Sequence, residues 1–208
     1  MSFIDGLINE CDIALKTLSF KKSGTDRPYP SDTKTLNLTK NEKNLSAELM
    51  RVNLAGEVAA QALYRGQAMV CKDKDVKAHL IQAGDEETDH LIWCKKRLKD
   101  LDGKPSILNP IWYAGSFAIG AFFGSMGEKT SLGFVEETEK QVVKHLERHL
   151  DRISPNDSET INILKTMRAD EDEHAQEAAE NGSESLSEPT KKFMSLTAKL
   201  MTSSSAYI

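Results

Sequence analysis

The feature that most constrains the fold is a glutamate–histidine pair that occurs twice with the same spacing, in Glu87-Thr88-Asp89-His90 and in Glu171-Asp172-Glu173-His174. Side chains three positions apart lie on one face of an α-helix, so each pair can grip one ion or two adjacent ions. On a helical wheel, the residues within about 40° of the two glutamates are apolar. They are Leu80, Ala83, Leu91, Cys94 and Leu98 around Glu87, and Leu164, Met167, Ala175 and Ala178 around Glu171. Each pair therefore borders the buried stripe of a helix.

The helix expected before the first pair offers Glu48 and Glu57 as a further carboxylate. Glu57 is favoured because it lies 30 residues before Glu87 and shares its face with Met50, Asn53, Gln61 and Tyr64. The helix expected before the second pair offers three acids. Its buried direction is set by Leu132, Val135, Val142, Val143, Leu146, Leu150 and Ile153.

Only Glu139 points along that direction, whereas Glu136 deviates from it by about 70° and Glu137 by about 170°. Glu139 lies 32 residues before Glu171, which nearly repeats the spacing of the first half. The chain therefore carries a twofold pattern of one glutamate followed by Glu-x-x-His.

This pattern is the ligand set of ferritin-like carboxylate proteins, in which two metal ions lie inside a four-helix bundle. Four buried glutamates would repel one another by about 4 kcal/mol per pair at 4 Å, and two divalent cations would cancel that charge. Carboxylates with imidazoles suit iron or manganese better than zinc. The alternative is that these acids and histidines lie on solvated faces, as most such residues do. We predict an all-α, ferritin-like bundle that binds two iron ions through Glu57, Glu87, His90, Glu139, Glu171 and His174.

Helical periodicity predicts four long helices, over 46–71, 74–101, 129–153 and 158–181. Glycine and proline residues punctuate them, and strand signals are essentially absent. Residues 3–20 predict a short amphipathic helix, with Phe3, Leu7, Cys11, Ala14 and Leu18 at helical spacing. Residues 21–44 are polar and contain Gly24, Pro28 and Pro30, which is typical of a linker or long loop. We expect an N-terminal arm, 1–44, and a di-iron domain, 45–208, that includes a hydrophobic segment, 105–127, and a C-terminal amphipathic helix beginning near Pro189.

Composition excludes several classes of partner and compartment. The net charge is −5 and the basic residues are scattered among acids, so we expect no nucleic-acid partner. Three separate cysteines without a CxxC pair indicate free thiols in a reducing compartment. Asp5 stands where a signal peptide carries basic residues, so we do not expect secretion.

The sequence resembles the demethoxyubiquinone hydroxylase family, the di-iron monooxygenases of ubiquinone biosynthesis, over about residues 48–202. The matching segments are RVNLAGE at 51–57, ALYRGQ at 62–67, EETDHL at 86–91, LNP at 108–110, SLGFV at 131–135, and Asp170-Glu171 leading to His174. The resemblance implies that the six residues above are iron ligands and that dioxygen hydroxylates the ring of demethoxyubiquinol. It also implies other ubiquinone-biosynthesis proteins as candidate partners.

The resemblance leaves the electron donor and two further residues open. NADH, the quinol itself or a reductase could supply the electrons. Tyr64 and His145 are candidates for supporting the ligands, and the alternatives are a core tyrosine and a solvent-facing histidine. The sequence does not indicate an oligomeric state.

A polyprenyl substrate calls for an apolar surface that opens toward lipid. The uncharged segment Ile111–Met126 has 16 residues, fewer than the roughly 20 that cross a bilayer. We predict an in-plane membrane contact, on the cytoplasmic face of the cell membrane if the chain is bacterial. The helices at 3–20 and 190–202 could share this contact. The alternative is a core helix that packs through Gly120 and Gly124.

Two other functions fit the same ligand set. One is ferritin-like oxidation and storage of iron, and the other is a di-metal redox enzyme such as a peroxidase or manganese catalase. The apolar segment argues against the first, because a soluble cage has little reason to expose it.

Overall fold

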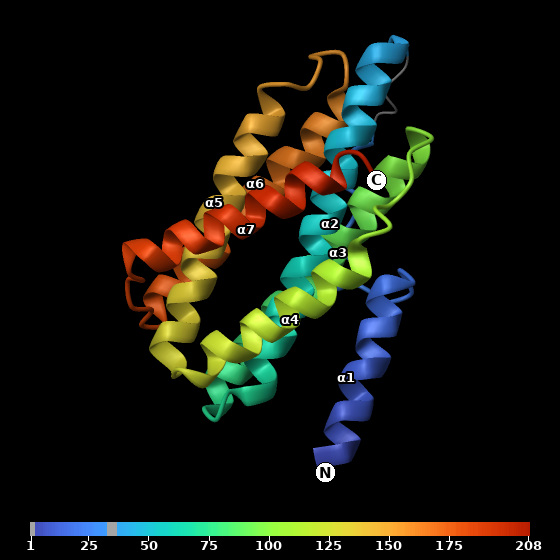
Figure 1. Cartoon of the computed structure of the whole chain (residues 1–208). Coiled ribbons are helices and arrows are strands. Elements are labelled where there is room, and N and C mark those ends of the chain that lie inside the picture. Colours follow the sequence, from blue (N-terminus) through green and yellow to red (C-terminus); the bar gives the residue numbers. More distant parts are fainter. Residues whose placement is uncertain (1–2, 33–36) are drawn as a thin grey trace.

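The computed structural model describes residues 3–32 and 37–208, and within these ranges it contains seven helices and no strand (Figure 1). The helices are α1 (Phe3–Leu18), α2 (Lys40–Val70), α3 (Lys74–Asp100), α4 (Asn109–Ser125), α5 (Glu128–Leu150), α6 (Ser158–Glu180) and α7 (Glu188–Ser205). Helices α2 and α3 pack as one hairpin and α5 and α6 as another, and the hairpins meet through α3 and α6. The predicted all-α, ferritin-like bundle with additional helices is confirmed.

The first long helix begins at Lys40 rather than at residue 46, because the sequence before it carries a capping box. The Thr39 side chain accepts a hydrogen bond from the Glu42 backbone N–H, and the Glu42 carboxylate accepts one from the Thr39 backbone N–H. These bonds satisfy orphan donors of the first turn. The five polar residues 40–44, which were predicted as loop, therefore belong to α2.

The core runs along the bundle axis and is built from residues at helical spacing. Its largest fully buried side chains include Leu49, Met50 and Leu54 of α2, Leu91 and Leu98 of α3, Leu132 and Leu146 of α5, and Ile163, Leu164 and Met167 of α6. Each such side chain contributes about 1.5–3 kcal/mol when it leaves water. These apolar side chains surround the glutamate and histidine residues that were predicted to face the interior of the bundle.

Helix α4 packs against the bundle on one side, as the core-helix interpretation of segment 111–126 expects, and faces solvent on the other, where the predicted membrane contact stays a prediction. Gly120 and Gly124 lie so close to α2 that an added Cβ would overlap the Leu63 carbonyl group at the first and would stand 2.9 Å from the Gln67 Cα at the second. On the other side, Ile111 and Phe122 are each 61% exposed. None of the helices, in the ranges given above, combines the length and apolar character needed to cross a bilayer.

The predicted N-terminal arm is connected to the bundle by polar contacts. Helix α1 is fixed to α2 by an ion pair between Glu10 and Arg65 and by a hydrogen bond from Thr17 Oγ1 to Gln61 Oε1, 3.1 Å long. Residues 22–29, predicted as a linker, lie along α3 instead of standing free. Residues 33–36 of that linker, and the side chains of Phe3 and Leu7, lie outside the described part of the chain.

Candidate metal centre

Four buried side chains from three helices converge at the centre of the bundle. Glu57 of α2, Glu87 and His90 of α3, and Glu171 of α6 each offer one ligand atom, and these atoms lie within 4.8 Å of one another. The spacing of Glu87 and His90 places both on the buried face of α3, as helical geometry requires. Three carboxylates and an imidazole at this separation can coordinate a divalent cation.

Two of the carboxylates extend between two imidazoles. The Oε2 atom of Glu87 lies 3.0 Å from Nδ1 of His90, and its Oε1 atom lies 3.2 Å from Nδ1 of His174. The corresponding distances for Glu171 are 3.2 Å from its Oε1 to Nδ1 of His90 and 3.7 Å from its Oε2 to Nδ1 of His174. Glu87 and Glu171 therefore each place one oxygen beside His90 and the other beside His174, where they would help to hold a cation next to each histidine.

The remaining two glutamates, Glu57 and Glu139, are associated with different histidines. Glu57 Oε2 lies 3.8 Å from Nδ1 of His90. Glu139 of α5 is buried and interacts electrostatically with Glu171, Glu87 and His174. The structure thus buries all six residues that the sequence selected in one region, with Glu57 beside His90 and Glu139 within electrostatic range of His174.

The donor atoms fit a pair of metal ions because several of them form no well-aligned hydrogen bond. Glu87 Oε1, Glu171 Oε2 and His174 Nδ1 are buried and lack such a bond, although the two carboxylate oxygens have His174 Nδ1 as an ion-pair neighbour within the cluster. Buried polar atoms are nearly always satisfied in folded proteins. These atoms instead face a common point, where cations would supply the missing interactions.

The pKa values of the cluster in the absence of cations also indicate a site that binds metal ions. Burial, followed by the charge of nearby carboxylates, raises the pKa of both Glu57 and Glu139 well above the ordinary value. Burial opposes protonation of His174, but Glu171 and Glu87 outweigh it and raise its pKa to about 12. Protons therefore partly neutralise the carboxylates, and bound cations would displace them.

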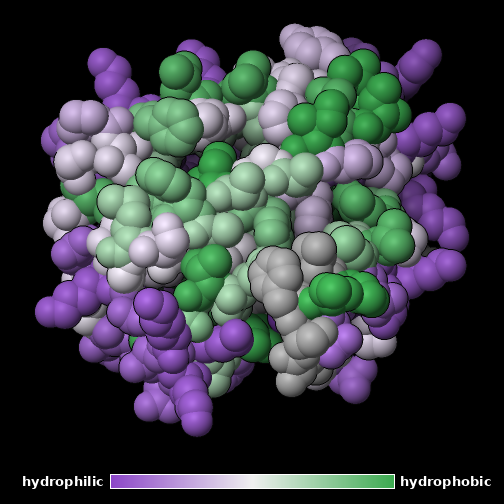
Figure 2. Space-filling view, turned by 60° about the horizontal axis from the view of Figure 1, so that its bottom comes forward, coloured by the Kyte–Doolittle hydropathy of each residue, from purple (hydrophilic) through white to green (hydrophobic). Residues whose placement is uncertain are grey.

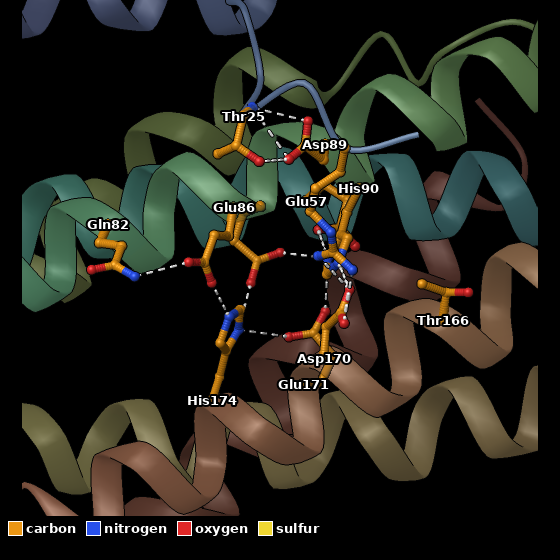
Figure 3. Close-up of polar contacts among 12 residues, drawn as sticks. Thr25, Glu57, Gln82, Glu86, Asp89, His90, Thr166, Asp170, Glu171 and His174 are labelled. Atoms are coloured by element: carbon orange, nitrogen blue, oxygen red, sulfur yellow. Dashed lines mark hydrogen bonds and ion pairs between the residues drawn. The ribbon is translucent and has the colours of Figure 1, made fainter. Parts of the chain in front are cut away.

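Each imidazole is held on its outer side by an acid from the opposite pair. Nε2 of His90 lies 2.8 Å from Oδ2 of Asp170, and Nε2 of His174 lies 2.8 Å from Oε2 of Glu86 (Figure 3). Such contacts fix the ring and direct its other nitrogen, here Nδ1, toward the metal position. The sequence reasoning missed both acids, although each directly precedes a glutamate of the repeated motif. A wheel for one helix places them off its buried face, because adjacent residues are about 100° apart.

The remaining candidates differ in their relation to the cluster. The Tyr64 hydroxyl donates a hydrogen bond to Glu139 Oε1 at 2.6 Å, and burial raises the pKa of this tyrosine, so it remains a donor. His145 lies further along α5, with its ring centroid 4.0 Å from that of His149. Glu136 bonds to Lys140 and Ser183, away from the cluster.

A cavity of about 1450 Å³ connects the cluster with the surface. Glu57, Glu139 and Glu171 line its inner part, and the exposed residues Ile111 and Leu200 line its outer part. Apolar side chains from four helices form much of the wall, among them Leu63, Ile119, Phe134 and Met194. Such a cavity suits an apolar ligand with a polar end at the carboxylates.

Known proteins are similar to this chain over almost its whole length. The family model of the ubiquinone biosynthesis protein COQ7 matches residues 44–205. The protein named 3-demethoxyubiquinol 3-hydroxylase from Legionella pneumophila (strain Lens) is 49% identical, over 100% of this chain and 98% of its own. The protein of the same name from Francisella philomiragia is 46% identical, over 97% of this chain and 96% of its own. The chain therefore belongs to the COQ7 family of ubiquinone biosynthesis proteins.

Proposed function

We propose that this chain is a di-iron monooxygenase that hydroxylates the ring of demethoxyubiquinol with dioxygen, in ubiquinone biosynthesis. The observation that carries the proposal is the apolar cavity that ends at Glu57, Glu139 and Glu171. A ferritin-like iron store needs a path for ions, whereas this cavity has the apolar wall that a polyprenyl quinol requires. Relatives of nearly the same length are named for this reaction.

The protein groups position the reactants and exclude water. Iron, when bound, supplies the activation of dioxygen that side chains cannot perform. Glu57, Glu87 and Glu171 would hold one ion with His90, and Glu139, Glu87 and Glu171 the other with His174. Tyr64 holds the Glu139 carboxyl through its hydroxyl hydrogen bond. Apolar walls would keep the quinol ring beside the cluster in a dry pocket.

Hydroxylation by dioxygen places one oxygen atom on the ring and releases the other as water, which requires two electrons and two protons. We propose NADH as the electron source. The assay combines protein loaded with two iron ions, NADH, labelled dioxygen and a short-chain demethoxyubiquinol. We expect a quinol with one labelled oxygen, detected by mass spectrometry. Absence of this product from protein that retains its iron, with NADH or with a chemical reductant, contradicts the proposal. Oxygen consumption that depends on ferrous iron alone would indicate iron storage instead.

We further propose that the protein acts at a membrane surface, on the cytoplasmic face in a bacterium. Exposed apolar side chains occur on three helices: Ile4, Ile8 and Leu15 of α1, Ile111 and Phe122 of α4, and Phe193, Leu196 and Leu200 of α7. Figure 2 shows a face of the molecule on which apolar residues gather between hydrophilic borders. Because Ile111 and Leu200 also line the cavity, a quinol could enter from lipid without crossing water.

Replacing both Leu196 and Leu200 by Ser is expected to reduce binding to lipid vesicles. Each of these leucine side chains is more than 60% exposed, and in the membrane-bound protein it would be buried in the lipid interface. The serine variant lacks this apolar contact. Flotation with vesicles of bacterial lipid composition measures the bound fraction. Ile92→Ser on α3 removes an exposed apolar residue that is not on these three helices and serves as the control. Equal flotation of the wild type and the double variant contradicts the membrane assignment.

A further inference from the structure

The polar segment 22–29 packs over the part of α3 that carries His90. We call this segment the strap. Its Thr25 backbone N–H donates to both carboxylate oxygens of Asp89, at 3.1 and 3.2 Å, and the Thr25 hydroxyl donates to the same carboxylate (Figure 3). Gly24 lies directly against Asp89, where an added Cβ would overlap the carboxylate. The strap is therefore fixed to the residue that immediately precedes a proposed metal ligand.

Arg27 of the strap contacts both groups that hold the His90 ring in place. Its Nη1 lies 2.8 Å from Oδ2 of Asp170 and its Nη2 donates to Oδ1 at 3.0 Å, a two-pronged pair. Asp170 Oδ2 is also the partner of His90 Nε2, at 2.8 Å. The Arg27 guanidinium carbon lies 5.1 Å from the centre of the Trp93 ring, and that ring lies 5.3 Å from the imidazole of His90.

The other histidine has a weaker support. Glu86, the partner of His174 Nε2, accepts a hydrogen bond from the neutral amide of Gln82 at 3.1 Å. Within the described part of the chain no arginine or lysine lies within ion-pair distance of its carboxylate, and Arg27 acts on it only at longer range through its charge. A planar guanidinium fixes a carboxylate by two parallel, charge-assisted bonds, which a single amide cannot do. The two halves of the cluster therefore differ although the motif repeats.

We propose that Arg27 is a positioning residue for the metal ion beside His90, so that the N-terminal strap completes one of the two metal positions. Arg27 orients Asp170 and Trp93, and these in turn orient the imidazole. This inference rests on the proposed di-iron centre. It assigns a role to a segment that contributes no ligand of its own.

The test compares Arg27→Gln with Lys22→Gln in the full-length chain. Lys22 is the matched control because it also belongs to the strap and forms an ion pair, 3.0 Å from Asp85, yet it does not contact Asp170 or Trp93. Ferrous iron is titrated into metal-free protein without oxygen, and its release to a colorimetric chelator is then followed. Removing the partner of a ligand typically costs 10–100-fold in metal affinity. We expect Arg27→Gln to lower the binding affinity for one of the two iron ions about 10-fold. We expect Lys22→Gln to bind both ions with wild-type affinity.

Further measurements separate positioning from general stability. Arg27→Lys keeps the charge but loses the two-pronged geometry, so we expect an affinity between those of the wild type and Arg27→Gln. Thermal unfolding of each metal-free variant sets a temperature at which all are folded, and iron is titrated there. Wild-type iron affinity in Arg27→Gln at that temperature, or equal loss in Lys22→Gln, overturns the inference. Failure of the wild type to bind two iron ions would instead refute the di-iron centre itself.

Discussion

Glu139→Gln is expected to leave the metal-free protein folded and to lower the binding affinity for one iron ion by at least about 100-fold. Loss of a residue that only supports a ligand costs up to about 100-fold, so loss of a ligand should cost at least that much. Burial raises the pKa of Glu139, which favours its neutral carboxyl in the metal-free protein, and glutamine reproduces the shape of that form. The amide oxygen can still accept the hydrogen bond from Tyr64. An uncharged amide cannot replace a carboxylate opposite a dication, and this explains the selective loss.

Glu136→Gln is the matched control, because it makes the same change three residues earlier in α5. Glu136 forms an ion pair with Lys140 and takes no part in the cluster, so both iron ions should bind with wild-type affinity. Ferrous titration and thermal unfolding of the metal-free variants measure the two effects separately. Two iron ions bound at full affinity by Glu139→Gln would show that this residue is not a ligand.

Gly120→Ala is expected to lower the melting temperature by about 5 °C or more, from roughly 2–3 kcal/mol of overpacking and about 2–4 °C per kcal/mol for a chain of this size. The added Cβ would stand 2.9 Å from the carbonyl carbon and 3.0 Å from the Cα of Leu63. Backbone cannot rotate away as a flexible side chain can. Helix α4 would therefore have to shift from α2, and the cavity between these helices would change shape.

Gly115→Ala provides the comparison within the same helix. No atom lies within 4 Å of a Cβ added at Gly115, and the residue is exposed. Alanine favours a helix interior over glycine by up to about 1 kcal/mol, so this variant should melt at the wild-type temperature or slightly above it. Thermal unfolding followed by circular dichroism checks both variants. Equal melting temperatures for the two would mean that α4 does not pack closely at Gly120.

The inward direction of the six cluster residues followed from the sequence because it depends on helical periodicity within single elements. The wheel separated Glu139 from Glu136 without any knowledge of neighbouring helices, and burial in the structure agrees with that separation. The start of α2 was misplaced, because a capping box was hidden in a polar stretch. Capping is also local, so Thr39 and Glu42 could have revealed it.

The sequence by itself determined the helical class and the repeated Glu and Glu-x-x-His pattern, since both are encoded in spacing along one chain, and its motifs gave the resemblance to the family. Only the tertiary structure decided that Glu86 holds His174 and that Asp170 holds His90, because these contacts join α3 to α6. It also decided that a polar segment predicted as a linker contacts the residues around His90. Contacts between distant segments depend on how helices cross, and no periodicity within one helix records that geometry.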